Sequence, residues 1–229
     1  MKFICFAGNN KVGKTTMAKA LNELIDNSDE MKAGRVSFGD ALREELVEYY
    51  GIPEEYVEDE HIDKNKIIID LGQYTHRPQM PELWLTLGII HATQDFYLPI
   101  TLRELYITHG TRIRRAQDPL YWIKKITEKI NALEDQVDLI INDDPRTASD
   151  FEYLLNYDTD IYHLKNGCSN ISDISQDAMN KWLTDNPQHI TKQIDVPLPL
   201  SQEDAKWINW EQVIGNDDLL KSILVMNNA

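Results

Sequence analysis

The sequence predicts an α/β fold in which a mostly parallel β-sheet is flanked by helices and interrupted by a helical insertion with a basic lid. Short apolar runs rich in β-forming residues recur along the chain, and segments with apolar residues at helical spacing lie between them. The chain has 229 residues, 42% of them hydrophobic, which is enough to bury one substantial core. We therefore expect a single domain over 1–229.

The first part of the core is predicted to consist of two strand–helix units. A buried strand at 3–6 is followed by apolar residues at helical spacing from Lys14 onward. A second strand at 35–38 precedes another amphipathic helix, which Gly51 ends. These units place core strands near 1–40.

The middle of the chain, about 51–133, is predicted to be almost wholly helical and to form the acceptor-binding and lid region. Thr101 and Glu104 have the spacing of a capping box, and the helix that they begin is expected to stop at Gly110. Asp118, which a proline follows, is expected to begin the next helix.

The later core strands are expected near 135–165. A buried-strand pattern at 137–141 is followed by a helix near 151–155, and 161–164 predicts one more strand. The remaining segment, about 168–229, is less regular, and we expect it to pack on the sheet edge as helix and loop.

Composition narrows the range of functions. The chain has 23 Lys and Arg against 38 Asp and Glu, a net charge of -15, so it lacks the basic face of a general nucleic-acid binder. Cys5 and Cys168 form neither a disulfide framework nor a CxxC pair. The sequence contains no run of about 18 apolar residues, so we expect no membrane-spanning helix. The first apolar run is too short for a signal peptide. We expect a soluble, cytoplasmic protein without nucleic-acid or membrane partners.

The most informative motif is the segment 8–15, Gly-Asn-Asn-Lys-Val-Gly-Lys-Thr, which matches GxxxxGK followed by Ser or Thr between a predicted strand and a predicted helix. A glycine-punctuated turn lets backbone N–H groups approach a polyphosphate, and the helix directs its positive dipole end at the anion. Lys14 would reach the β- and γ-phosphates, and the Thr15 hydroxyl would ligate Mg²⁺. The motif predicts a P-loop NTPase that binds ATP through Gly8, Asn10, Lys11, Val12, Gly13, Lys14, Thr15 and Thr16.

Further patterns distinguish the classes of P-loop protein. GTPases carry a guanine-specificity element of the form NKxD. Asn65 and Lys66 match its first two positions, but Ile68 stands where the element has aspartate, so the element is missing. The apolar run that ends in Asp143 and Asp144 loosely resembles the carboxylate-tipped strand of motor ATPases, so an ATPase or regulatory module remains an alternative. A small-molecule kinase should carry a basic lid that closes over the transferred phosphoryl group.

Three arginines within four residues fit such a lid. Arg112, Arg114 and Arg115 follow a glycine that is expected to end a helix, and planar guanidinium groups match phosphoryl oxygens well. On a loop they could swing in and exclude water. The alternative is an exposed basic helix start balanced by the acidic block 44–63. Trp122 could stack on a base or pack in the core.

The segments 8–16, 37–46, 103–122 and 144–150 together resemble the bacteriophage deoxynucleoside monophosphate kinases, P-loop enzymes of the nucleoside monophosphate kinase fold. The resemblance implies transfer of the ATP γ-phosphoryl group to a deoxynucleoside 5′-monophosphate with Mg²⁺. The products would be ADP and the deoxynucleoside diphosphate, for phage DNA synthesis in the host cytoplasm. Family analogy also allows a homodimer.

The resemblance implies roles for individual residues. The catalytic set is Lys14, Arg114, Arg115, Arg146 and Asp144. The acceptor nucleotide would be bound by Asp40, Arg43, Asp118, Trp122, Asp144, Arg146 and Asp150, and Thr15 would hold Mg²⁺. Two positions depart from the family: Asp150 stands where a glutamate is usual, and Lys192 replaces the acid of a late His-containing element.

The chemistry of such a reaction depends mainly on charge. The phosphate of the acceptor has a second pKa of about 6, so at neutral pH it is already mostly dianionic and needs no strong general base. Catalysis would consist of alignment and charge neutralisation by Mg²⁺ and the cationic side chains. A kinase of the dephospho-coenzyme-A or phosphomevalonate type remains an alternative, and the sequence predicts no base specificity.

Overall fold

The computed structural model describes residues 1–9, 12–27, 31–58, 62–70, 99–165 and 174–196, together with 208, 210 and 213. The chain divides into two compact units, Met1–Ser37 with Ile126–Ala229, and Phe38–Lys125. Across the described ranges, none of the helices combines the length and apolar character that a membrane crossing requires.

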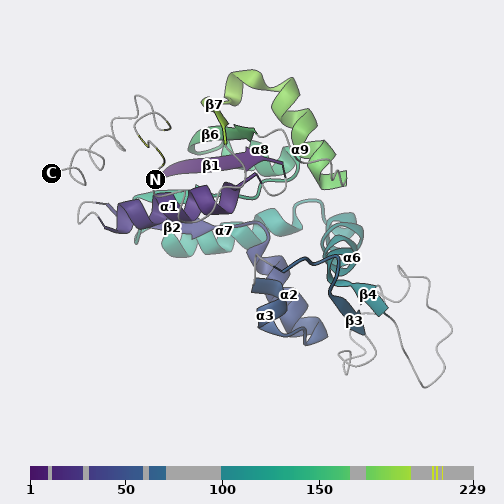
Figure 1. Ribbon diagram of the computed structural model, residues 1–229. Coiled ribbons are helices and arrows are strands. Elements are labelled where there is room, and N and C mark those ends of the chain that lie inside the picture. Colours follow the sequence, from purple (N-terminus) through teal and green to yellow (C-terminus); the bar gives the residue numbers. More distant parts are fainter. Residues whose placement is uncertain are drawn as a thin grey trace. The chain divides into compact units, whose positions relative to one another are not determined.

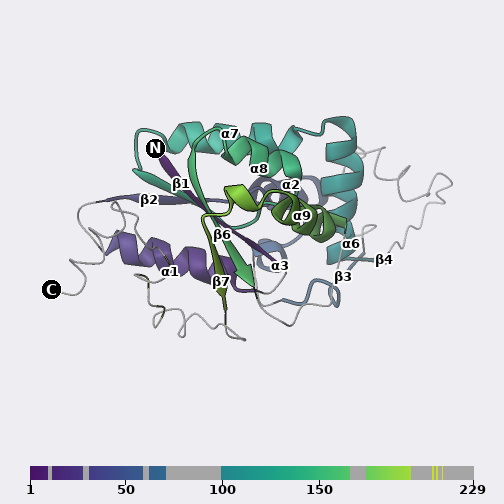
Figure 2. The ribbon, with the colours of Figure 1, turned by 90° about the horizontal axis from the view of Figure 1, so that it is seen from above.

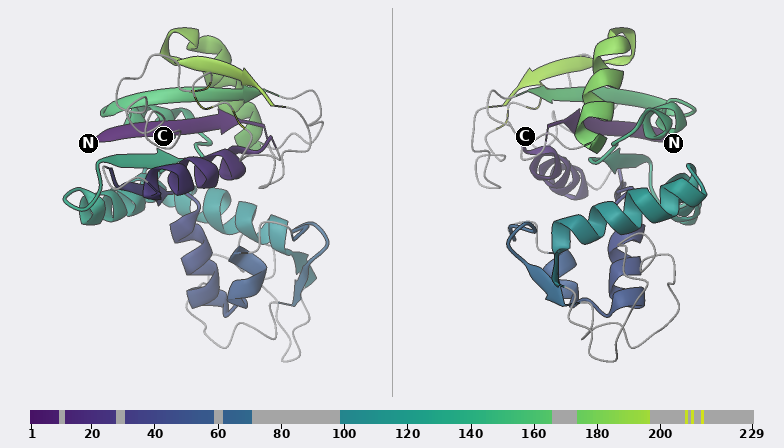
Figure 3. Two further views of the ribbon diagram at one scale, coloured as in Figure 1. Left: turned by 60° about the vertical axis from the view of Figure 1, so that its left-hand side comes forward. Right: turned by 90° about the vertical axis from the view of Figure 1, so that its right-hand side faces the viewer.

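The first unit is built on a five-stranded parallel sheet with the order β2-β5-β1-β6-β7 (Figures 1 and 3). The strands are β1 (Lys2–Gly8), β2 (Ala33–Val36), β5 (Leu139–Asn142), β6 (Asp158–Lys165) and β7 (Lys192–Asp195). The central strand, β1, pairs with β5 on one side and with β6 on the other. Its residues Phe3 to Ala7 are fully or almost fully buried, as the apolar run in the sequence predicts.

One face of the sheet is covered by α1 (Lys14–Asp26) (Figure 2). The buried side of this helix repeats at intervals of three and four residues, with Met17, Leu21 and Ile25 in one apolar cluster. Ile4 and Phe6 of β1 belong to the same cluster, because alternate residues of a strand point to the same face.

The opposite face carries α8 (Ala148–Leu154) and α9 (Ile174–Asp185), together with the part of α7 (Tyr121–Leu133) that belongs to this unit (Figure 2). The ring of Phe3, which points away from α1, lies 4.4 Å from that of Tyr157. Phe151 of α8 stacks on Trp182 of α9 with 4.1 Å between the ring centroids. The sheet is therefore enclosed by helices on both faces, as predicted.

The topology identifies one edge of this sheet as a place for a ligand. After β1 the chain turns to α1 on one face, and after the neighbouring β5 it turns to α8 on the other (Figure 2). Ligands of open α/β sheets bind beyond the carboxyl ends of strands at such a divergence. The glycine motif follows β1, so it lies at this position.

The second unit contains mainly short elements. They are α2 (Asp40–Tyr50), α3 (Glu54–Glu58), β3 (Ile68–Asp70), β4 (Pro99–Thr101), α6 (Leu102–Ile107) and the π-helix η1 (Thr108–Arg115). Their core includes Leu46, Tyr50, Leu102, Leu105 and Ile113. Gly51, at φ 66, ends α2 in the left-handed conformation, as predicted.

Three local predictions for the chain are wrong. The middle is not almost wholly helical, since β3 and β4 pair antiparallel. The segment beyond 168 contributes a fifth strand, β7, which adds to the edge at β6. The helix that Thr101 caps does not stop at Gly110: α6 continues into η1, and the lid arginines are therefore on a helical segment instead of a loop. Gly110 serves close packing, because a Cβ there would lie 3.0 Å from a Leu42 methyl carbon.

Candidate functional site

The glycine motif connects β1 to α1, and two of its glycines have backbone conformations that other residues rarely adopt. Gly8 has φ 146, and a Cβ there would lie only 2.4 Å from the carbonyl oxygen of Leu164. Gly13 has φ 95 and directly precedes α1. Both glycines are therefore required by the path of the chain. Asn10 and Lys11, predicted to bind phosphate, lie outside the described residues.

Lys14 is the first residue of α1 and is almost fully buried. Its ammonium group donates to the carbonyl oxygens of Gly8 at 2.9 Å and Asn9 at 2.8 Å. Burial, assisted by the positive charge of Arg146, lowers its pKa to about 7, although nearby carboxylates act in the opposite direction. A second cation close enough to lower the pKa of Lys14 forms with it a site that an anion would stabilise.

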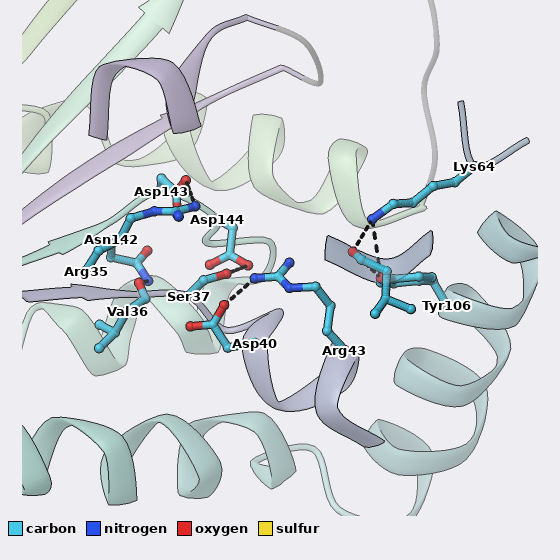
Figure 4. A network of polar contacts seen from close by, with 11 residues as sticks. Arg35, Val36, Ser37, Asp40, Arg43, Lys64, Tyr106, Asn142, Asp143 and Asp144 are labelled. Carbon is cyan, nitrogen blue, oxygen red and sulfur yellow. Dashed lines mark hydrogen bonds and ion pairs between the residues drawn. The ribbon is translucent and has the colours of Figure 1, made fainter. Parts of the chain in front are cut away.

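Asp143 directly follows β5, and its carboxylate lies near the Thr15 side chain. It is buried and accepts a hydrogen bond from Arg35 Nη2 at 2.8 Å (Figure 4). The Thr15 side chain lies near enough to act on its pKa. Burial and the negative charge of Asp144 raise the pKa of Asp143, and the contacts from Arg35 and Thr15 only partly offset this. The carboxylate is therefore a group that additional positive charge would stabilise.

The oxygen atoms at this position fit a magnesium ion. Asp143 Oδ1 is buried and has no hydrogen-bond partner among the described residues. Together with the Thr15 hydroxyl it offers hard oxygen ligands, which Mg²⁺ prefers. No group of three or more His, Cys, Asp or Glu side chains suited to a metal occurs in the described ranges. A magnesium ion held by one or two protein oxygens and by the substrate phosphates agrees with this donor set.

The ends of β2 and β5 are joined by side-chain hydrogen bonds. Ser37 Oγ donates to Asp144 Oδ2 at 2.5 Å, and Asn142 Nδ2 donates to the carbonyl oxygen of Val36 at 3.0 Å (Figure 4). These contacts orient Asp144 at the same sheet edge as the glycine motif, because parallel strands end on the same side. Asp144 is predicted to be catalytic, and the structure places it beside Asp143.

Asp150 holds the loop that carries Arg146. Its carboxylate is fully buried and accepts from the backbone N–H groups of Arg146 and Thr147, both at 2.9 Å. Thr147 and Asp150 form a capping box at the start of α8. The geometry assigns Asp150 a structural contact, and its contact with an acceptor nucleotide remains a prediction.

The remaining predicted site residues belong to the second unit. Asp40 and Arg43 form an ion pair within the first turn of α2 (Figure 4). The Asp118 carboxylate accepts from the Leu120 backbone N–H at 3.0 Å and pairs with Lys124 at 2.6 Å, so it begins α7 as an N-terminal turn. Its pKa is lowered by these two contacts.

Trp122 and Arg114 each make a hydrogen bond within the second unit. Trp122 is 3% exposed, and its indole Nε1 donates to the carbonyl oxygen of Gly110 at 2.9 Å. Arg114 donates from Nε to Glu45 at 2.9 Å, and Arg115 ends η1 as a half-buried residue. The burial of Trp122 agrees with one of its two predicted roles, packing in the core. The other role, stacking on a base, remains a prediction.

The structure thus collects part of the predicted set within the first unit. Lys14 lies near Asp143, Asp144 and Arg146, and Thr15 lies near Asp143. Val12 is buried in the core beneath the motif. Thr16, the second residue of the motif helix after Lys14, is half buried. The carboxylate, hydroxyl, ammonium and guanidinium groups of this cluster are those that a bound magnesium triphosphate requires.

Comparisons with known proteins do not identify a family. No family model matches the chain, and no curated protein matches it in sequence. Among solved structures, an unliganded sugar kinase from Janibacter sp. HTCC2649 matches with a TM-score of 0.37 and 13% identity, over 96% of this chain and 97% of that one. A likeness this weak carries no argument about activity, which therefore depends on the residues of the site.

The site contains several residues that are not among those predicted from the sequence. Asp143 directly follows a predicted strand, so its position is a signal that could have indicated it. Arg35 lies on β2 and reaches Asp143 across the sheet. Gln176 of α9 donates to the side-chain oxygen of Asn9 at 2.8 Å and thereby supports the glycine motif. No local pattern indicates the roles of Arg35 and Gln176, because both depend on strand and helix neighbours.

Proposed function

We propose that this protein is an ATP-dependent phosphotransferase whose acceptor is a deoxynucleoside 5′-monophosphate. The observation that carries the proposal is the position of the glycine motif after β1, which brings Thr15 and the buried Lys14 close to Asp143 at the end of the neighbouring β5. A hydroxyl and a carboxylate lie near each other there, beside the ammonium group of Lys14. This is the arrangement that P-loop enzymes use to hold a triphosphate and its metal.

The donor triphosphate would be bound by backbone and side chain together. The N-terminus of α1 directs free N–H groups and its positive dipole end toward the phosphates. Lys14, whose ammonium group is held by two carbonyl oxygens, would exchange them for phosphate oxygens and regain full charge. Thr15 and Asp143 would hold Mg²⁺, whose charge offsets that of the phosphates.

The acceptor phosphate is an anion that must approach another anion. Arg146 lies at the site, because its charge already lowers the pKa of Lys14. Asp150 fixes the backbone at Arg146, and Arg114 and Arg115 of the second unit are proposed to supply further guanidinium groups. The acceptor is already ionised at neutral pH, so these cations would contribute more to the rate than any general base.

The specific acceptor class rests on the family resemblance and on residues that surround an acceptor in that family. We propose that Asp40, Arg43, Asp118 and Trp122 contribute to acceptor binding. An acceptor of another kind, such as dephospho-coenzyme A or phosphomevalonate, would use the same donor site, so only the substrate separates these activities.

The decisive experiment measures ADP release with Mg²⁺ and ATP while each deoxy- and ribonucleoside monophosphate is offered in turn. We expect diphosphate product from at least one deoxynucleotide and none with the Lys14→Ala variant, which should melt as a cooperative unit like the wild type. Absence of product with every nucleotide, alongside product from dephospho-coenzyme A or phosphomevalonate, would replace the proposed acceptor.

A second candidate is an ATPase or regulatory module. The fully buried strand β5, which Asp143 directly follows, favours it, since such a strand with a carboxylate near the motif hydroxyl also serves ATP hydrolysis. Steady release of inorganic phosphate from ATP without any acceptor, increased by a protein or DNA partner, would support this candidate over the kinase.

A further inference from the structure

A buried polar cluster in the second unit is not used by the donor site. The Glu45 cluster, as we call it, consists of Glu45, Tyr50, His109, Arg114 and Tyr121. Glu45 Oε2 lies 2.7 Å from His109 Nε2 and 2.9 Å from Arg114 Nε, and the Tyr121 hydroxyl donates to Oε1. The Tyr50 hydroxyl oxygen lies 2.9 Å from His109 Nδ1. Glu45 is 5% exposed and His109 is fully buried.

The chemistry of these groups determines which atom donates and which accepts in each hydrogen bond of the cluster. Burial would raise the pKa of Glu45, but the bonds from His109 and Tyr121 and the charge of Arg114 outweigh this, so its pKa is lowered and it is an acceptor. His109 must then donate from Nε2, and because burial lowers its pKa the ring is neutral. Nδ1 therefore accepts from the Tyr50 hydroxyl. Glu45 is the single acceptor for three donors.

Arg114 is fixed on one edge and open on the other. Its Nε binds Glu45, and its guanidinium carbon lies 5.3 Å from the centre of the Tyr49 ring and 5.0 Å from that of Tyr121. In the part of the chain that the structure describes, Nη1 and Nη2 make no hydrogen bond. The side chain is 16% exposed. Paired N–H groups on the open edge match the oxygen atoms of a phosphate.

The π-helix explains how two side chains reach the same carboxylate oxygen. His109 and Arg114 are five residues apart, and i to i+5 bonding in η1 places such residues one turn above each other. In an α-helix, with 3.6 residues per turn, the same spacing would turn them to different sides. π-helical turns are rare and frequently occur at functional sites.

We propose that Glu45 is a positioning residue that holds Arg114 by its Nε edge, so that the Nη edge receives a phosphate group of a bound nucleotide. His109 and Tyr121 keep the Glu45 carboxylate in place. A buried ion pair is often no more stabilising than apolar side chains of the same volume, so stability alone does not account for the cluster. The identity of the nucleotide rests on the proposed function. The inference that the Nη edge of Arg114 binds a phosphate group does not depend on it.

The kinetic test is a double-mutant cycle of Glu45→Gln and Arg114→Ala, with kcat and the KM values for ATP and acceptor measured separately. Glu45→Gln should lower kcat between about 10- and 100-fold by releasing the guanidinium, and should lower it no further when Arg114 is already alanine. Glu104→Gln is the matched control, because it removes an exposed carboxylate that binds Arg112 at 2.5 Å on the same helical segment. It should leave kcat unchanged.

The outcomes of the cycle have distinct meanings. If Glu45→Gln reduces kcat equally in the wild-type and Arg114→Ala backgrounds, or lowers only the melting temperature, the positioning role is wrong. A change confined to the KM for ATP would assign the phosphate to the donor, and one confined to the KM for the acceptor would assign it to the monophosphate.

A second measurement does not require turnover. In ¹⁵N-labelled protein, the Nε–H resonance of Arg114 is identified by its loss in Arg114→Ala, and the wild type is titrated with inorganic phosphate. We expect a saturable shift in the wild type and in Glu104→Gln but not in Glu45→Gln. An unshifted resonance in the wild type, or an equal shift in Glu45→Gln, overturns the inference. A normal shift in a wild type without kinase activity overturns the proposed function alone.

Discussion

The protonation of Lys14 allows a quantitative test of the donor site. In the free protein burial lowers the pKa of this ammonium group to about 7, and its nitrogen donates to the carbonyl oxygens of Gly8 and Asn9. Phosphate oxygens in place of these carbonyls would stabilise the charged form and return the pKa toward the ordinary lysine value of about 10.4. ATP binding should therefore be coupled to proton uptake.

The extent of uptake follows from the two pKa values. At pH 8 a group with a pKa of about 7 is protonated in about 9% of molecules, so binding should take up about 0.9 proton. At pH 6 the group is already about 91% protonated, and uptake should fall to about 0.1 proton. The sign of this trend is informative, since a carboxylate that becomes protonated on binding would show uptake decreasing as the pH rises.

Isothermal titration calorimetry in buffers of different ionisation enthalpy measures this number directly. Lys19→Met, which changes another lysine of α1, is the matched control and should keep the uptake. Binding of ATP without proton uptake at pH 8, or with equal uptake at pH 6 and pH 8, would show that Lys14 does not change its charge. The assignment of Lys14 to the phosphates would then be wrong.

Three further predictions concern single contacts. Gly8→Ala should destabilise the protein by more than about 1 kcal/mol in urea unfolding, because its Cβ would meet the Leu164 carbonyl oxygen at 2.4 Å. Asp143→Asn should raise the Mg²⁺ concentration for half-maximal turnover about 10-fold or more, and an unchanged Mg²⁺ dependence would contradict its proposed role. Trp122→Phe should cost about 1–3 kcal/mol of unfolding free energy, because the buried Gly110 carbonyl loses its donor, and unchanged stability would mean that this bond contributes nothing.

The candidate site could be predicted from the sequence only where local geometry decides it. The sequence predicts Lys14 and Thr15 because the glycine spacing, the preceding strand and the following helix all lie within 25 residues of one another. Asp143 was not preferred over Asp144, because the rotation of the chain after β5 decides which of two adjacent carboxylates meets Thr15. The other carboxylate, Asp144, accepts a hydrogen bond from Ser37, which directly follows β2.

For the lid arginines, too, the sequence predicts one part and tertiary contacts decide the rest. Their number and spacing are visible in the sequence, but the sequence also predicts, wrongly, that Gly110 ends a helix. The structure uses that glycine for contact with Leu42 and continues the helix as a π-helix. Glu45 lies in the acidic block 44–63, and it is buried where His109, 64 residues later, donates to it.

By itself the sequence determined the alternation of strands and helices and the glycine loop, because backbone conformation and apolar periodicity are properties of neighbouring residues. Tertiary structure alone decided the strand order, the edge strand β7, the choice of Asp143 and the burial of Glu45. Each of these depends on a partner that lies far along the chain, and a buried charge is stable only after folding has brought that partner within hydrogen-bonding distance.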